Sequence, residues 1–431
     1  MGTSRIPAAR GKTALVLAGG GLTGAVYEIG ALRAIDDLLV DRTVNDFDIY
    51  VGTSAGALVA TMLASGVSPG LMLEVMTGGH PYLPAIRPND LFSVRPEELL
   101  RSSVKLPRKV LAAWSRYLKR RPDTTLWDLL WLALEALPAG LYESSGLENY
   151  VRRVMRIGGY SNHFSDLQRT LYIIATNLDN GERAVFGPGY EENVLLSQAV
   201  AASAALPLFY KPVRIGDSEY VDGGLRGNAS LDLAIEQGAT LVVCINPIVA
   251  FDNQSPSAIT GLDGVPVHIS ERGVQAVTSQ VLSILLHSGL HYHVKQLRRH
   301  HRNVDIILIE PQPYDEHMHF DNIMRYSAQL TIARHGFESV TLDLAEDFAH
   351  YREVLARHNI PVSRRLLVEE MQEIWASDYD PEVLRHILSS RPKVERAPGG
   401  WASELRDTLS ELEAALDRIA SAENAPELLK L

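Results

Sequence analysis

Residues 48–60 read DIYVGTSAGALVA: an apolar segment, a turn of small residues and a second apolar segment. The first segment carries the β-branched and aromatic residues of a buried strand, and the alanines and leucine of the second favour a helix. Between them, Gly52, Ser54 and Gly56 form a G-x-S-x-G pattern. In this strand-to-helix context the pattern predicts a sharp turn that lifts the Ser54 hydroxyl clear of the backbone at a helix N-terminus. Ser54 is therefore a candidate nucleophile, with a helix-capping serine as the alternative.

A second glycine-rich turn lies earlier in the chain. Residues 14–24, ALVLAGGGLTG, predict a strand, the glycines Gly19, Gly20 and Gly21, and the start of a helix. The spacing also satisfies the G-x-G-x-x-G pattern of dinucleotide-binding turns. That fold needs an acidic residue at the end of the second strand, where this chain has the turn at 52–56. A serine hydrolase would instead use glycine amides as oxyanion donors, because no side chain obstructs the approach of an acyl group.

The third motif is EYVDGG at residues 219–224, in which Asp222 ends a predicted strand and Gly223 and Gly224 follow it. A nucleophilic serine needs a base, and Asp222 is the candidate. Asp-Gly is also a common turn signal, so its spacing alone favours an acidic turn residue.

In this order, the blocks GGGLTG, GTSAG and DGG resemble those of the patatin-like acyl hydrolases. The segments ATNLDNGERAVF (175–186) and AVAASAALPLFYKPV (199–213) resemble the same family, and the resemblance covers about residues 12–345. It implies a dyad without a catalytic histidine, in which Ser54 attacks an ester carbonyl and Asp222 is the general base. It also implies that Gly20 and Gly21 help to form the oxyanion hole.

Two positions depart from the family pattern. Relatives usually carry Arg or Lys where this chain has Thr23, and often proline where it has Ser230. The missing cation predicts weaker oxyanion stabilisation or a different preferred head group, whereas the change at Ser230 affects loop stiffness.

The succession of segments predicts an α/β fold. Strand-like and helical patterns alternate from residue 13 to about 246, which indicates a three-layer sandwich with a mainly parallel central sheet. A helical insertion interrupts this rhythm at about 76–140, and residues 318–390 again predict helices. We therefore expect an N-terminal tail at 1–11, an acyl hydrolase domain at 12–345 and a helical C-terminal extension at 346–431.

The chain has 431 residues, 46% of them hydrophobic and 22% charged, with a formal net charge of −11. This composition is typical of globular proteins, and the acidic balance argues against binding to nucleic acid. The single cysteine, Cys244, forms no disulfide within the chain, which favours a reducing compartment. We see neither a signal-peptide core nor an apolar run long enough to span a bilayer. The sequence thus predicts a cytoplasmic protein that can contact membranes peripherally.

Two further segments suggest partners. Residues 101–121 hold eight Lys and Arg and no acidic residue, and the apolar stretch 126–137 follows. This combination predicts contact with an anionic membrane, with a solvated basic face beside a core helix as the alternative. Near the C-terminus a short heptad seam could pair two chains or dock onto the parent domain; it consists of Leu405, Leu409, Leu412, Leu416 and Ile419.

Histidines cluster in HYHVKQLRRHH, at His291, His293, His300 and His301. No carboxylate or cysteine stands nearby at ligand spacing, so we predict no metal and no other cofactor.

The sequence therefore predicts a serine-dependent lipid acyl hydrolase of the phospholipase A or carboxyl esterase type, acting on a lipid or ester substrate. Three alternatives stay open. The first is an α/β-hydrolase esterase whose Ser-Asp-His triad uses His268 or His287. The others are a dinucleotide-binding protein and a catalytically silent lipid-binding protein.

Overall fold

The computed structural model describes residues 11–93, 140–254, 267–313 and 326–390. The N-terminal tail up to residue 10, the basic and apolar stretches of the expected insertion and the leucine seam lie outside these ranges. Among the described residues, no helix combines the length and the apolar composition needed to cross a membrane.

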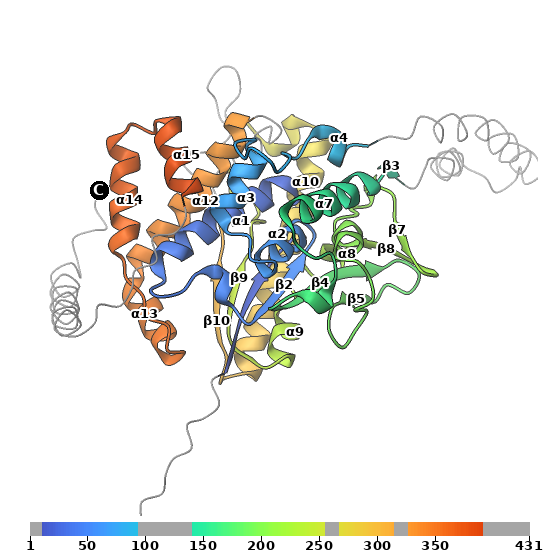
Figure 1. Ribbon diagram of the computed structural model, residues 1–431, viewed down its shortest axis with the longest axis horizontal. Coiled ribbons are helices and arrows are strands. Elements are labelled where there is room, and N and C mark those ends of the chain that lie inside the picture. Colours follow the sequence, from blue (N-terminus) through green and yellow to red (C-terminus); the bar gives the residue numbers. More distant parts are fainter. Residues whose placement is uncertain (1–10, 94–139, 255–266, 314–325, 391–431) are drawn as a thin grey trace, which may run out of the picture.

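A mainly parallel sheet forms the centre of the molecule (Figure 1). Its strand order is β10-β9-β1-β2-β4-β8-β7, and β5 also pairs with β4. The strands are β1 (Lys12–Leu17), β2 (Ile49–Thr53), β4 (Thr170–Asn177), β5 (Arg183–Phe186), β7 (Val213–Ile215), β8 (Ser218–Asp222), β9 (Ala239–Ile245) and β10 (Asp305–Ile309). The five strands from β10 to β4 run parallel, whereas β5, β7 and β8 are antiparallel to their neighbours. A separate ladder joins β3 (Gly140–Tyr142) to β6 (Leu208–Tyr210).

Helices cover both faces of this sheet, which gives the three layers expected from the sequence (Figure 1). Along β1, Leu15 and Leu17 enter one core and Ala14 and Val16 the other, because successive side chains of a strand point to opposite faces. The first core includes helices α1 (Gly21–Leu38), α2 (Ala55–Ala64), α3 (Pro69–Met76), α4 (Pro88–Leu91), α7 (Ser145–Gly158) and α8 (Leu196–Ser203). The second core includes α9 (Leu231–Glu236) and α10 (Val274–His300).

The C-terminal helices belong to the first core. They are α12 (Tyr326–Glu346), α13 (Phe348–Arg357), α14 (Arg365–Ala376) and α15 (Pro381–Ser389). Helices α12 and α14 pack against α1, and α15 packs against α3. A Cβ atom on Gly30 of α1 would lie 2.0 Å from the carbonyl oxygen of Ala333 in α12, so the two backbones touch. The buried Arg33 forms ion pairs with Asp37 and, at 2.9 Å, with Glu370 of α14.

Candidate active site

The turn between β2 and α2 has the conformation that the G-x-S-x-G pattern predicts. Ser54 adopts φ 55° and ψ −120°, a strained conformation for a residue with a side chain. The flanking glycines are required by packing. A Cβ on Gly52 would lie 2.6 Å from the Ala57 Cα, and one on Gly56 would lie 2.4 Å from the Leu17 carbonyl oxygen. Small residues therefore let this turn press against the end of β1.

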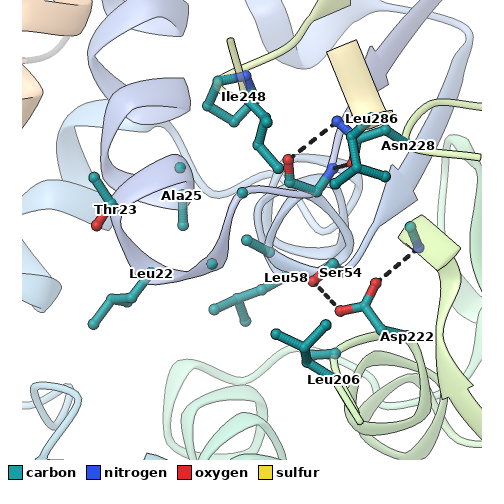
Figure 2. A pocket seen from close by; sticks show the side chains of 18 of the residues that line it. Leu22, Thr23, Ala25, Ser54, Leu58, Leu206, Asp222, Asn228, Ile248 and Leu286 are labelled. Atoms are coloured by element: carbon teal, nitrogen blue, oxygen red, sulfur yellow. Dashed lines mark hydrogen bonds between the residues drawn. The ribbon is translucent and has the colours of Figure 1, made fainter. Parts of the chain in front are cut away.

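The sheet brings Ser54 and Asp222 together from opposite sides of β4. Thr53, the last residue of β2, pairs with Ile174 of β4, and Asp222, the last residue of the antiparallel β8, pairs with Ala175. The two side chains therefore meet above the same point of the central strand. The Ser54 Oγ donates a hydrogen bond to the Asp222 Oδ2 at 2.5 Å (Figure 2).

Asp222 is held by its own turn. Its Oδ1 accepts a hydrogen bond from the Gly224 amide at 2.7 Å. Gly223 lets this turn lie against β4, because a Cβ there would be 2.3 Å from the Ile174 carbonyl oxygen. Only 5% of Asp222 is exposed, and this burial raises the pKa of the carboxyl to about 6, while the hydrogen bonds from Ser54 and Gly224 oppose the rise.

Ser203 supports the Ser54 turn and was not singled out from the sequence. Its Oγ accepts the Ser54 amide at 2.8 Å and donates to the Ile174 carbonyl at 2.5 Å, so it links the turn to β4. It lies at the end of α8, within the 199–213 segment that carried the family resemblance.

The glycine loop between β1 and α1 is fixed by a second residue that sequence reasoning missed, Asn228. The Gly19 amide donates to the Asn228 Oδ1 at 3.1 Å, so it is not available to a substrate, contrary to our expectation for this glycine. Gly20 and Gly21 differ. Within the described ranges their amides have no hydrogen-bond partner, and Gly21 adopts φ 61°, which favours glycine. They begin α1, whose dipole favours negative charge at this end.

A cavity of about 500 Å³ opens beside these groups (Figure 2). Its walls are largely apolar and include Leu22, Leu58, Leu206, Ile248 and Leu286. Thr23 also lines it, so the position that departs from the expected family pattern lies at the cavity. No histidine of the described ranges lines this cavity.

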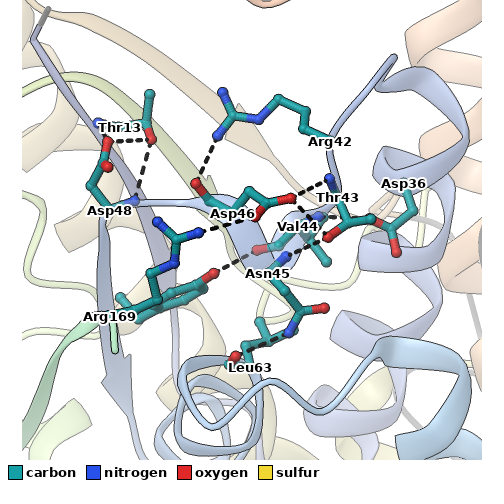
Figure 3. Close-up of polar contacts among 11 residues, drawn as sticks. Thr13, Asp36, Arg42, Thr43, Val44, Asn45, Asp46, Asp48, Leu63 and Arg169 are labelled. Carbon is teal, nitrogen blue, oxygen red and sulfur yellow. Dashed lines mark hydrogen bonds and ion pairs between the residues drawn. The ribbon is translucent and has the colours of Figure 1, made fainter. Parts of the chain in front are cut away.

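The opposite end of β2 is anchored by polar contacts (Figure 3). The Asp48 carboxylate accepts both the amide and the hydroxyl of Thr13, at 2.8 and 2.9 Å. Asp46 accepts the Thr43 amide and the Arg169 guanidinium, each at 3.0 Å. These bonds tie the start of β2 to β1 and β4, which fixes the strand whose other end carries Ser54.

The patatin-like phospholipase family matches residues 15–80 and 98–235. The chain belongs to this family. The matched residues contain Ser54, Asp222 and the glycine loop and end within α9. Helix α10 and strand β10 follow after the match.

Three relatives illustrate the range of similarity. An uncharacterized protein, R571, of Acanthamoeba polyphaga mimivirus is 27% identical, over 49% of this chain and 57% of that protein. The probable lipid hydrolase 463L of Invertebrate iridescent virus 6 is 20% identical, over 52% and 63% respectively. A cGAMP-activated phospholipase of Escherichia coli (strain TW11681) is 27% identical, over 50% and 52%. The matches thus span between 52% and 63% of these relatives' own lengths.

A solved structure is also similar. The crystal structure of VipD from Legionella pneumophila aligns with a TM-score of 0.36 at 15% identity, over 78% of this chain and 67% of that one.

The histidines of α10 do not form a single cluster but contact different partners. His293 lies 3.5 Å from Asp232, and the His300 Nδ1 lies 2.8 Å from the Gln296 carbonyl oxygen. His287 and His291 both face Glu310, a carboxylate that we did not connect with them from the sequence. It follows the strand after α10, so sequence spacing gives no sign of the contact.

Proposed function

We propose that this protein is a lipid acyl hydrolase in which Ser54 is the nucleophile and Asp222 the general base. The observation that carries the proposal is the direct 2.5 Å hydrogen bond from the Ser54 Oγ to the Asp222 carboxylate, at a turn whose strained φ aims the hydroxyl at the cavity. Membership of the patatin-like phospholipase family supports the substrate class, a carboxyl ester of a lipid.

The first half of the reaction follows from these groups. Asp222 takes the Ser54 proton as Oγ bonds to the ester carbonyl carbon. The carbonyl oxygen becomes negative and accepts hydrogen bonds from the Gly20 and Gly21 amides at the N-terminus of α1. The intermediate then collapses, the bond to the alcohol oxygen breaks, and that oxygen takes the proton from Asp222.

The second half releases the acyl chain. Water attacks the acyl-serine and passes a proton to Asp222, and Ser54 recovers that proton as the fatty acid leaves. The largely apolar cavity of about 500 Å³ suits an acyl chain. The uncharged Thr23 beside the loop favours substrates that need no cation at this position.

The geometry supports this proposal over the alternatives. A triad needs a histidine between serine and aspartate, whereas Ser54 contacts Asp222 directly and, among the described residues, no histidine lines the cavity. A dinucleotide site needs an acidic residue after β2, where Ser54 stands.

The test is hydrolysis of a soluble short-chain ester and of phospholipid vesicles. We expect Ser54→Ala to reduce kcat by up to ~10⁶-fold and Asp222→Asn by at least ~10⁴-fold, because nucleophile and base act as a unit. A fluorophosphonate probe should label the wild type and not Ser54→Ala. His268→Ala is the control and should keep its rate within a few-fold.

Full activity in Ser54→Ala would refute the proposed nucleophile. Loss of activity in a folded His268→Ala variant would replace the dyad by a triad. A wild type that neither reacts with the probe nor cleaves any ester would indicate a lipid-binding protein.

A further inference from the structure

Outside the proposed active site, two histidines and a carboxylate meet between α10 and the end of β10. His287 and His291 lie one turn apart on α10, so they share one face of the helix. The Glu310 Oε2 lies 2.6 Å from the His291 Nε2, and its Oε1 lies 3.5 Å from the His287 Nε2. One ligand atom from each of the three residues lies within 4.8 Å of the others.

This is the donor set of an open zinc site. Two imidazoles at i and i+4 with one carboxylate supply three ligands and leave a fourth position for water. A tetrahedral zinc ion holds its ligand atoms about 3.4 Å apart, given bonds of about 2.0–2.1 Å. The two histidine–carboxylate distances, 2.6 and 3.5 Å, lie on either side of this value. The His291 side chain is 51% exposed and has room to rotate.

Glu310 has the supporting contact that a metal ligand needs. Its Oε1 accepts a hydrogen bond from the Asn246 Nδ2 at 2.7 Å. Such a contact orients a ligating carboxylate and tunes its affinity for the ion.

The same contact leads to the glycine loop. The Asn246 Oδ1 accepts the Asn228 Nδ2 at 2.8 Å, and the Asn228 Oδ1 accepts the Gly19 amide at 3.1 Å. Both asparagines are buried. Each of these two side-chain amides has a fixed orientation, because its oxygen accepts one hydrogen bond and its nitrogen donates another. Glu310 is thus linked to the loop whose next two amides face the cavity.

Helix α10 forms a second connection. Leu282 and Leu286, five residues before His287 and His291 respectively, line the cavity beside Ser54. An ion that joins α10 to Glu310 would therefore also fix one wall of the cavity.

We propose that His287, His291 and Glu310 bind a divalent transition metal ion, zinc by its ligand preference, and that this ion clamps α10 to β10 and holds the glycine loop in place. The ion contacts no substrate, so its role is positioning. The effect on catalysis rests on the function proposed above, whereas metal binding itself does not.

The test uses the full chain without a histidine tag, stripped with chelator and then titrated with Zn²⁺ against a chromogenic chelator. We expect one Zn²⁺ per wild-type chain. His291→Ala and Glu310→Gln should each weaken binding by at least ~100-fold, since even loss of an outer-sphere partner weakens a metal site 10–100-fold. His293→Ala is the matched control, because His293 lies on the same helix but faces Asp232.

Two further measurements separate metal binding from catalysis. Zn²⁺ should raise the Tm of the wild type, of His293→Ala and of Ser54→Ala, but not of His291→Ala. Turnover of a soluble ester by the stripped wild type should recover on addition of Zn²⁺. Equal Zn²⁺ affinities in His291→Ala and His293→Ala would overturn the site. Stoichiometric binding that leaves turnover unchanged in an active enzyme would overturn the positioning role alone.

Discussion

The two halves of helix α1 both depend on glycine, but for opposite purposes. At its N-terminus, Gly20 and Gly21 leave backbone amides facing a cavity. In its second half, Gly30 brings the backbone of α12 into contact, and Arg33 joins α14 through a buried ion pair. Close packing of the second half against α12 and α14 fixes the position of the helix. The Gly20 and Gly21 amides can therefore stay without a hydrogen-bond partner among the described residues. The free amides of the first turn therefore depend on the packed interface between α1, α12 and α14.

Valine at one glycine from each half should separate the two purposes most strongly. Gly30→Val should lower the free energy of unfolding by about 3 kcal/mol, because its Cβ would meet the backbone of α12. Gly21→Val has open space around its Cβ, so only backbone strain of about 1–2 kcal/mol is expected. Its turnover should nevertheless fall by ~10²–10³-fold, since a donor is displaced.

Denaturant unfolding and ester turnover measure the two quantities on each variant. If Gly30→Val is as stable as the wild type, the helix contact does not fix α1. If Gly21→Val keeps full turnover, the first turn of α1 does not bind the oxyanion.

The pH dependence of activity should follow the ionisation of Asp222 in the proposed active site. Burial raises the Asp222 pKa from 3.8 to about 6, and the base must be ionised to accept the Ser54 proton. The value of kcat/KM on a soluble ester should therefore be constant above neutral pH and fall about tenfold per pH unit below about 6. A profile that stays flat down to pH 4.5 in a folded enzyme would exclude Asp222 as the base.

A smaller effect is expected at Glu28, in the interior of α1. Its side chain is fully buried, neither carboxylate oxygen has a partner among the described residues, and burial raises its pKa well above 4.5. The folded state therefore binds a proton that the unfolded state releases above pH 4.5, so this residue makes the protein less stable as pH rises from that value.

Glu28→Met should remove this pH dependence and increase the free energy of unfolding at pH 8 by about 1–3 kcal/mol, because a desolvated polar group is replaced. Unfolding of wild type and variant at pH 5 and pH 8 gives the comparison. An equal difference between the two proteins at both pH values would show that Glu28 does not change protonation on unfolding.

The sequence predicted those features of the fold that depend on residues close together in the chain. Residues 48–60 predicted strand β2, helix α2 and the Ser54 turn between them, because G-x-S-x-G has one favourable conformation in that context. The residues that hold the site together could not be found this way. Asn228 contacts Gly19 across 209 positions, and Ser203 contacts Ser54 across 149. Neither forms a pattern within a window of sequence.

For the same reason, the sequence did not connect Glu310 with His287 and His291. Helical spacing places His287 and His291 on one face, but Glu310 joins them through the pairing of β10 with β9, which no local pattern specifies. The antiparallel strands at one edge of the sheet and the packing of α14 on α1 were likewise set by tertiary contacts.

The placement of Ser54 and Asp222 on either side of β4 has a consequence for the synthesis of the protein. The two residues are 168 positions apart, so Ser54 leaves the ribosome long before Asp222 is translated. At about 5–20 residues per second, the delay is about 8–34 s. Throughout this interval the nascent chain lacks Asp222 and strand β8. If Ser54 and Asp222 act together as proposed above, ester cleavage cannot begin before β8 has been synthesised, and the onset of cleavage during translation would report late folding.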